Sequence, residues 1–452
     1  MNETVEKKKL RLNYPQIFLI GFGFLASSLA WAVYNSQVPL ILEQRFLLSN
    51  TVIGAIMTID NFFGVIFQPL IGAWSDNTRT RIGRRMPWIA IGLPICALFF
   101  ALVPLQHVLW AFMTMVIGFN LVMALWRSPV ISLMPDVAPS PLRSEANGII
   151  NLMGGAGSII AFFVGGILSD IRDDKFFAFL MAAVIMVIAL AILLLFVREP
   201  DALKYKEEKD IPIKNNIANR WGQRSQEQFS IYRQSINIVE DVSEVSSESN
   251  HRSFTAFNAL PRDFKRSLIA LLVAIFSWFL GYNAIETFFT LYATNTYGIT
   301  GGQATMMLTG FSLAFLVFAI PAGLLASKIG RKRTILIGLV GIVAAFLPIL
   351  VEPSQILVQI LLIIGGMFWA CININSLPMV LEFATDRTIG AFTGYYYLFS
   401  FTAAIVSPIF FGFIQDALQS NDLLFLYAVL CFGIALICMS FVRHGEIQRS
   451  AE

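Results

Sequence analysis

Charge is scarce in this sequence of 452 residues. Asp, Glu, Lys and Arg together make up 13%, whereas 56% of the residues are hydrophobic. A soluble domain carries about twice that share of charged residues. The net charge is only +3, so a basic surface for binding nucleic acid is not expected either. The scarcity of charge excludes an ordinary water-soluble protein.

Residues that bind metals or react as nucleophiles are also few. The chain has three histidines, scattered over loops and the C-terminus, and four cysteines, all inside apolar segments. These residues are His107, His251, His444, Cys96, Cys371, Cys431 and Cys438. No Cys-x-x-Cys pair and no catalytic constellation is present, so we expect packing cysteines, no metal site, no cofactor and no enzymatic activity.

Long apolar runs are abundant. They are about 20 residues long, which suits helices that cross roughly 30 Å of hydrocarbon, and they lack the alternating polarity of a membrane β-barrel. We therefore predict an all-α integral membrane protein with twelve transmembrane helices. The expected spans are 15–36, 50–72, 86–105, 108–131, 145–168, 177–197, 265–291, 303–326, 333–351, 355–380, 388–413 and 423–442.

The distribution of positive charge predicts the orientation in the membrane. Of 32 Lys and Arg residues, the outer loops would hold only Arg45, Arg172 and Lys175. By the positive-inside rule, both termini are then cytoplasmic in a multi-pass protein of the plasma membrane. The first run could be read as a signal peptide, but eleven further spans follow it, so we expect it to remain as the first helix.

A polar stretch divides the spans into two groups of six. We predict a cytoplasmic N-terminus at 1–14, a six-helix bundle at 15–197, a cytoplasmic linker at 198–263, a second bundle at 264–442 and a cytoplasmic C-terminus at 443–452. The Ser-rich linker has too few bulky apolar residues to build a core. Its mixed segment 221–238 leaves a regulatory docking role open.

The two groups repeat one short loop. Gly72 and Asp76 end the second span and are followed by Gly83, Arg84 and Arg85. The eighth span has a matching loop with Gly323, Ser327, Gly330, Arg331 and Lys332. A plain charged turn would explain the basic residues but not the paired glycines. The repeat predicts two pseudo-symmetric bundles.

This loop resembles the signature of the major facilitator superfamily. Residues 77–89 resemble the loop of the glycoside-pentoside-hexuronide cation symporters, and Gln68-Pro69 is similar to the sucrose carriers. The segment around Asp136, Arg143 and Asn147-Gly148 fits the same group. The resemblance implies the major facilitator fold, cation-coupled sugar transport and a gate at the cytoplasmic side. In that gate Asp76 would form a latch to a helix end of the other half, and Ser327 could not.

Three ionisable residues lie inside apolar spans, where charge is costly and therefore functional by default. They are Asp60, Arg127 and Glu286. Asp60 and Arg127 are candidates for coupling or for a merely structural ion pair. Glu286 is a rival coupling acid, unless it lies at a helix end near the outer surface.

The chain departs from the resembling carriers at their cation sites. Gly64 and Gln68 stand where melibiose permease has aspartates, and Asn120 stands where the sucrose carriers have an aspartate. Because Asp60 and Glu286 remain, we favour proton coupling through one of them, with Na⁺ or facilitated diffusion left open.

Neutral polar and aromatic residues in the spans supply candidates for a sugar site, since amides bind hydroxyls and aromatic rings stack on pyranose faces. The candidates are Asn35, Gln37, Asn61, Gln68, Asn147, Asn151, Asn283, Asn373, Asn375, Tyr34, Trp126, Tyr282, Trp369 and Tyr395. Helix packing is the alternative for each. The glycines Gly154, Gly155, Gly157, Gly165 and Gly166 indicate close helix packing and not a nucleotide loop.

The sequence thus predicts a secondary transporter that moves a sugar or glycoside by alternating access, and we expect it to act as a monomer. A drug or lipid exporter of the same fold is an alternative, because a cavity rich in the 40 Phe residues would suit such solutes. A sugar-sensing protein that signals through the linker is another.

Overall fold

The structure is a computed structural model that describes residues 12–138, 142–197, 199, 260–384, 388–420 and 422–444. Most of the predicted linker, with its segment 221–238, lies outside the described residues. The described chain contains twelve helices that are long and apolar enough to cross a membrane. The prediction of an all-α protein with twelve transmembrane helices is confirmed.

Two groups of helices form the two halves of the molecule. The N-terminal half contains α1 (Tyr14–Gln44), α2 (Asn50–Met57), α3 (Ile59–Asn77), α4 (Met86–Leu102), α5 (Leu109–Val137), α6 (Arg143–Ile160), α7 (Gly166–Ser169) and α8 (Phe176–Phe196). The C-terminal half contains α12 (Arg262–Tyr297), α13 (Gly301–Ile329), α14 (Arg331–Phe346), α15 (Gln355–Leu381), α16 (Ile389–Leu418) and α17 (Leu423–Phe441). Short 3-10 turns extend α4 and α14, and a π-helical turn joins α6 to α7.

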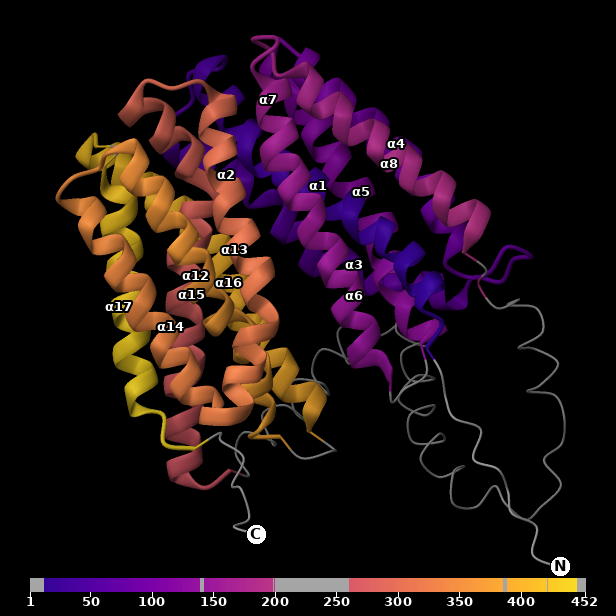
Figure 1. The fold of residues 1–452 in the computed structure, drawn as a ribbon. Coiled ribbons are helices and arrows are strands. Elements are labelled where there is room, and N and C mark those ends of the chain that lie inside the picture. The colour runs from indigo at the N-terminus through magenta and orange to yellow at the C-terminus, as the bar shows by residue number, and fades with distance from the viewer. Residues whose placement is uncertain are drawn as a thin grey trace, which may run out of the picture.

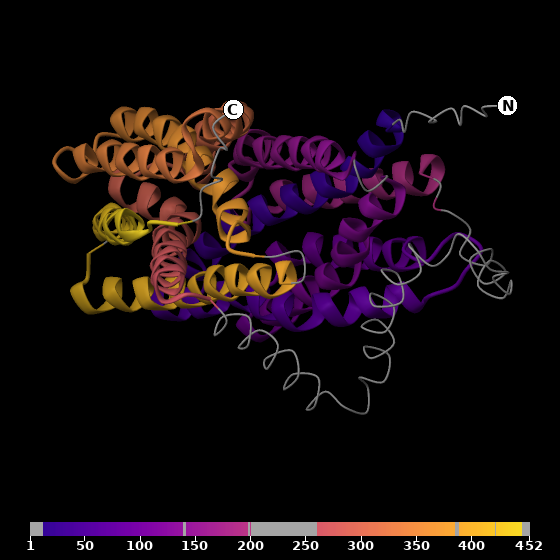
Figure 2. The same cartoon turned by 90° about the horizontal axis from the view of Figure 1, so that it is seen from below.

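The two halves contact each other at one end of the molecule and are apart at the other (Figure 1). α1 begins and α17 ends at the lower end of the molecule in this view, which we call the N/C face. The halves diverge toward the N/C face and meet at the opposite face. There α2 packs against α16, α7 packs against α13, and α1 packs against α12. Figure 2, the view from below, shows the N-terminal half beside the C-terminal half.

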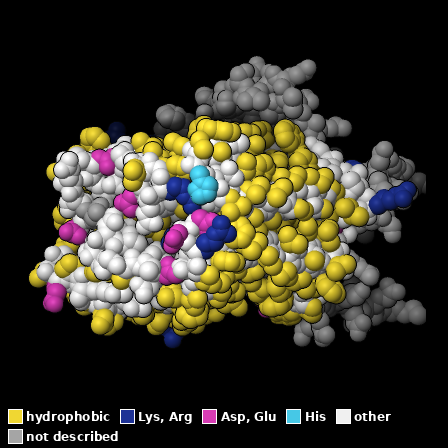
Figure 3. Space-filling view, turned by 90° about the horizontal axis from the view of Figure 1, so that it is seen from above, with side chains coloured by type: hydrophobic (Ala, Val, Ile, Leu, Met, Phe, Trp, Pro, Cys, Tyr) yellow, Lys and Arg dark blue, Asp and Glu magenta, His cyan; other side chains and the backbone are white. Residues whose placement is uncertain are grey.

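The flanks of both halves expose large apolar side chains, as helices in contact with lipid must. Figure 3 shows a broad hydrophobic surface, with charged side chains gathered in separate small groups. Exposed examples are Leu98, Leu195, Ile437 and Phe441. Fully buried aromatic rings such as Phe119 and Phe346 fill the interior of each half instead.

The second of the twelve spans is broken at Thr58, where α2 ends and α3 begins. The Thr58 hydroxyl donates to the Ala55 carbonyl at 2.8 Å, which occupies an acceptor at the end of α2. Below the break α3 packs mainly on α5, whereas α2 packs on α16 of the other half. The break places Asp60 in the first turn of α3, where the helix dipole favours a negative charge.

Glycines let helices approach to backbone contact. A Cβ on Gly157 would lie 2.3 Å from the Leu25 carbonyl oxygen, and one on Gly166 would lie 2.8 Å from the Gly302 carbonyl oxygen. Such distances leave no room for a side chain. The interpretation of this glycine-rich segment as close helix packing is confirmed.

Replacement of Gly157 by Ala therefore forces α6 away from α1. We expect Gly157→Ala to lower the stability of the purified protein by about 1–3 kcal/mol, the usual cost of overpacking. Thermal unfolding in detergent measures the change. Gly433→Ala is the matched control, because a Cβ there meets nothing within 4 Å. Equal stability of both variants would contradict the packing argument.

Candidate functional site

A cavity of about 790 Å³ lies between the two halves. Its wall includes residues of α1 and α6 from the N-terminal half and of α12, α13 and α15 from the C-terminal half. The halves are in contact at the opposite face, along what we call the seam, and diverge toward the N/C face (Figure 1).

A hydrogen bond between the halves lies on the cavity wall. The Asn35 side-chain amide on α1 donates to the Glu286 carboxylate on α12 at 3.1 Å, and both residues line the cavity. α12 continues to Tyr297, three turns beyond Glu286. Glu286 therefore lies within a candidate membrane span and not at the end of its helix.

The other two intramembrane charges lie beside the cavity and not on its wall. The Asn61 amide donates to the Asp60 carboxylate at 3.0 Å, and the Arg127 guanidinium lies over the Trp31 ring at 5.8 Å. Among the described residues, Asp60 and Arg127 form no ion pair at contact distance. The hypothesis of a contact pair is therefore not met in this conformation.

Several of the predicted sugar-site residues come together on the cavity wall. They are Asn35, Asn151, Tyr282, Trp369 and Asn373. The Tyr282 and Trp369 rings stack with their centroids 4.4 Å apart and their planes within 4°. Trp369 is almost fully covered, so Tyr282 presents the open aromatic face of this stack.

Four other predicted sugar-site residues make hydrogen bonds or packing contacts away from the cavity. The Gln37 amide donates to the Thr305 hydroxyl at 2.8 Å in the seam between the halves, because α1 extends well beyond the predicted end of the first helix. Asn283 and Asn375 donate to carbonyls of their own helices, at 2.7 Å and 2.9 Å. Trp126 is fully buried against α4, where a Cβ on Gly92 would lie 2.9 Å from it. None of these four lines the cavity, so their part in a sugar site stays a prediction.

The remaining candidates also lie off the cavity wall. Tyr34 is buried and accepts a hydrogen bond from the Asn120 amide at 3.3 Å. The backbone carbonyl of Gln68 accepts a hydrogen bond from the Ser128 hydroxyl at 3.0 Å, and the Asn61 amide donates to Asp60. Asn147 is exposed near the start of α6, and Tyr395 packs edge-on against Phe392.

The cavity wall is mainly apolar outside this polar group. Apolar lining residues come from both halves and include Phe24, Phe162, Phe311, Phe315 and Leu316. Ser28, Ser158 and Ser312 add hydroxyl groups to it. A solute in this cavity therefore meets amides, hydroxyls, the carboxylates of Glu286 and Glu145, and a larger number of apolar side chains.

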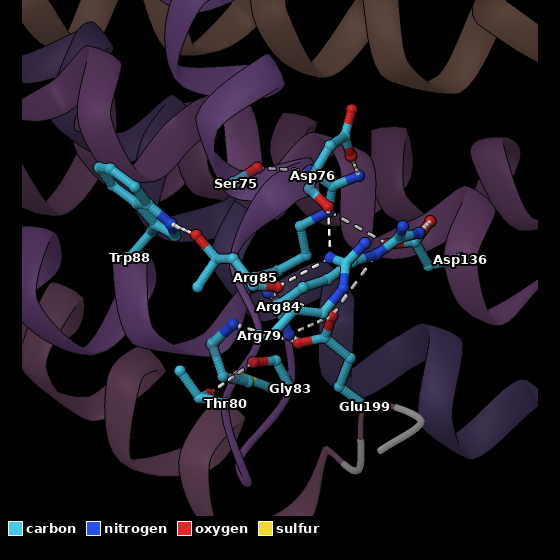
Figure 4. Close-up of polar contacts among 12 residues, drawn as sticks. Ser75, Asp76, Arg79, Thr80, Gly83, Arg84, Arg85, Trp88, Asp136 and Glu199 are labelled. Atoms are coloured by element: carbon cyan, nitrogen blue, oxygen red, sulfur yellow. Dashed lines mark hydrogen bonds and ion pairs between the residues drawn. The ribbon is translucent and has the colours of Figure 1, made fainter. Parts of the chain in front are cut away.

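The repeated loop of the N-terminal half holds a charged cluster at the N/C face (Figure 4). The buried Arg85 guanidinium pairs with Asp76 and with Asp136, the latter at 3.1 Å, and also donates to the Ser75 hydroxyl. Arg84 binds the same Asp136 carboxylate with two nitrogens, at 2.5 Å and 3.2 Å. The cluster ties the loop to the end of α5.

Burial by itself disfavours the charge of Arg84, but the hydrogen bond and the negative charge of Asp136 outweigh this effect. The pKa of Arg84 is raised as a result. Its guanidinium therefore stays charged in the cluster at every physiological pH.

Glu199, which sequence reasoning missed, completes this cluster. Its carboxylate accepts from the backbone N–H groups of Arg84, Arg85 and Met86 at 2.9–3.1 Å, and so caps the start of α4. Gly83, with φ +114°, turns the loop there, and a Cβ on it would lie 2.1 Å from a Glu199 carboxylate oxygen. The only sequence signal was an acid directly after the sixth span.

The C-terminal half contains a reduced copy of the cluster. Arg331 pairs with Glu382 and donates to the Pro378 carbonyl at 3.1 Å. Glu382 follows Arg331 by 51 residues and Asp136 follows Arg84 by 52, so the repeat spacing could have identified Glu382 in advance. Gly330 turns this loop with φ +95°, and Lys332 reaches the Ser440 carbonyl at 3.4 Å.

The expected latch between the halves is not formed in this conformation. Asp76 pairs with Arg85 of its own half, because the halves are apart at the N/C face. Gly72 does allow close approach, with a Cβ position 3.3 Å from the Ser128 hydroxyl, whereas Gly323 has more room. Arg143 begins α6, but its side chain lies outside what the structure describes.

Comparison with known proteins identifies the class. The profile of the Major Facilitator Superfamily matches residues 20–301 and again 271–451. The chain therefore belongs to this superfamily of membrane transporters, a class without enzymatic activity.

Relatives of the chain include a resistance protein and a transporter. The chain is 22% identical to the tetracycline resistance protein, class E, of Escherichia coli over 402 residues, 87% of this chain and 86% of that protein. It is 24% identical to the isoprimeverose transporter of Lactiplantibacillus pentosus over 222 residues, 45% of this chain and 46% of that protein.

Solved structures share the fold. The xylose transporter of E. coli in its inward-open conformation matches with a TM-score of 0.66 and 14% identity, over 97% of this chain and 98% of that one. An inward-facing bacterial homologue of the human lysosomal transporter Spinster also matches with a TM-score of 0.66, at 14% identity over 94% and 95%.

The geometry of Glu199 makes a testable prediction. Glu199→Ala leaves three backbone N–H groups at the start of α4 without their acceptor, and we expect a loss of about 1–3 kcal/mol of stability. Thermal unfolding measures it. Glu199→Gln keeps an acceptor oxygen and should lose less. Glu352→Ala, at an exposed acid of the opposite face, is the control, and an equal effect of both alanine variants would contradict the capping role.

Proposed function

We propose that this protein is a cation-coupled transporter of a sugar or glycoside, with H⁺ as the coupling ion. The N/C face would be cytoplasmic and the protein would lie in the plasma membrane, as the distribution of Lys and Arg favours. The described conformation would then be the inward-facing state of an alternating-access cycle.

The Asn35–Glu286 hydrogen bond on the cavity wall is the observation that carries this proposal. It joins an acid to a polar group of the other half at the place where a solute would bind. The nearby amides of Asn151 and Asn373 and the open face of Tyr282 are suited to hydroxyl groups and to a sugar ring.

Glu286 is the better candidate for the coupling acid. It lies on the cavity wall and accepts a hydrogen bond from the other half, so gain or loss of a proton there would act on solute binding and on the contact between halves at once. Asp60 does not line the cavity, and its carboxylate accepts a hydrogen bond from its neighbour Asn61. Asp60 and Arg127 would then tune the charge that Glu286 experiences.

A second candidate function is export of an amphipathic drug. The many Phe, Leu and Ile residues on the cavity wall favour it, since apolar walls bind drug-like solutes. The similarity to a tetracycline resistance protein points the same way. The polar group around Glu286 would then hold the charged or hydroxylated part of the drug.

Purified protein in liposomes separates these functions. We expect an inward-directed proton gradient to drive uphill uptake of labelled glucosides, whereas an inward-directed Na⁺ gradient should not. Parallel vesicles receive tetracycline. Proton movement that occurs with tetracycline and not with any glucoside would support the exporter. Absence of proton movement with every glucoside would overturn the sugar proposal.

Glu286→Gln tests the coupling role. Because the amide cannot exchange a proton, we expect uphill uptake to fall to the level of vesicles without a gradient, while exchange of labelled for unlabelled solute continues. Asp60→Asn should retain part of the uphill uptake. Glu352→Gln, an exposed acid far from the cavity, is the control. The reverse result for the two acids would assign the coupling to Asp60.

A further inference from the structure

An acid of the C-terminal half caps a helix of the N-terminal half at the opposite face. The Asp416 carboxylate on α16 accepts from the backbone N–H groups of Asn50 and Thr51, at 2.9 Å and 2.8 Å. It also accepts from the Thr51 hydroxyl at 2.5 Å. α2 begins at Asn50, so Asp416 occupies donors that the first turn of α2 leaves without an intrahelical partner.

An acid of the N-terminal half does the same in return. The Asp170 carboxylate, directly after α7, accepts from the Gly302 backbone N–H at 2.8 Å and from the Thr300 hydroxyl. α13 begins at Gly301, so this acid lies on the first turn of a helix that belongs to the other half. Both carboxylates also meet the positive end of a helix dipole.

The two caps are related by the internal repeat. Asp170 follows the fifth span and caps the eighth, whereas Asp416 ends the eleventh span and caps the second. The second and eighth spans are corresponding members of the two halves, and so are the fifth and eleventh. The same contact is thus made twice, once in each direction across the seam.

Both caps require the halves to be in backbone contact. A Cβ on Gly412 would lie 2.3 Å from the Asn50 carbonyl oxygen, and one on Gly54 would lie 2.1 Å from the Pro408 carbonyl oxygen. On the other side of the seam, a Cβ on Gly302 would lie 2.2 Å from the Gly166 carbonyl oxygen. Separation of the halves at this face therefore breaks both caps together.

We propose that Asp170 and Asp416 form the gate at the opposite face, a pair of reciprocal helix caps that holds the cavity closed there. Opening to that face releases both carboxylates, and water must then take over the donors of α2 and α13. The caps set how often the protein opens at this face. This role does not depend on which solute or ion is carried, or on which face is cytoplasmic.

Spin-label distances across the seam test this gate. Val108 of the N-terminal half and Val351 of the C-terminal half are exposed in loops at the opposite face, at 53% and 88%. Both are replaced by labelled cysteines in a chain whose four native cysteines are alanines. Pulsed electron paramagnetic resonance without substrate then gives the fractions of molecules closed and open at this face.

Loss of one cap, in Asp170→Ala or Asp416→Ala, should raise the ratio of open to closed molecules about fivefold, which is the usual effect of losing a helix cap. The double variant should raise it roughly 25-fold, since the two contacts are separate but belong to one transition. The matched control is Asp173→Ala with Glu352→Ala, which removes two exposed acids from the same face without touching a cap. A shift no larger than that of the control would overturn the proposal.

A second pair of variants tests the gate without any change of charge. Gly412→Ala forces α16 away from α2 and should lengthen the same label distance, whereas Gly433→Ala should not, because its Cβ meets nothing within 4 Å. Asp416→Asn keeps an acceptor oxygen and should shift the ratio less than Asp416→Ala. If the double alanine variant does not fold, these variants decide the question. An unchanged distance in Gly412→Ala would overturn the proposal.

Discussion

The backbone-to-backbone approach of the two halves at the opposite face is the contact on which the rest of the structure depends. Gly54, Gly412, Gly166 and Gly302 allow it, because no side chain separates the helices there. Helices in lipid gain little from burying apolar surface, so such close packing and the hydrogen bonds beside it must supply the attraction. With the seam closed at this end, the halves diverge at the other and leave the cavity between them.

The break in the second span connects this seam to the intramembrane charges. α2 packs against α16 of the C-terminal half, whereas α3 packs mainly against α5 of its own half. Asp60 lies directly after the break between them. Glu286 touches the other half through Asn35 a short way from the same seam. A change in the contact between the halves therefore changes the surroundings of both acids. In the proposed coupled transport, ion binding and gate movement would share this element.

The two halves share their arrangement of helices and loops but differ in the polar and aromatic side chains at equivalent places. Trp126 and Trp369 occupy equivalent spans, yet Trp126 is buried inside its half and Trp369 lies behind Tyr282 on the cavity wall. The N-terminal half has a cluster of two arginines and three acids at the N/C face, whereas its counterpart has Arg331 with Glu382. The repeat could predict where these loops lie. It could not predict how far each half has diverged from the other.

The sequence by itself determined the twelve membrane helices, the twofold repeat and the presence of three intramembrane charges, because each depends on local composition and spacing. Tertiary structure decided which polar groups share a site. Asn35 meets Glu286 across 251 residues, and Asp416 meets Asn50 across 366. Helical periodicity assigns a side chain to one face of its helix, but the neighbour of that face depends on how the halves pack. For this reason the sequence could not show that Gln37 and Trp126 lie off the cavity wall, and it missed Glu199 and Asp170.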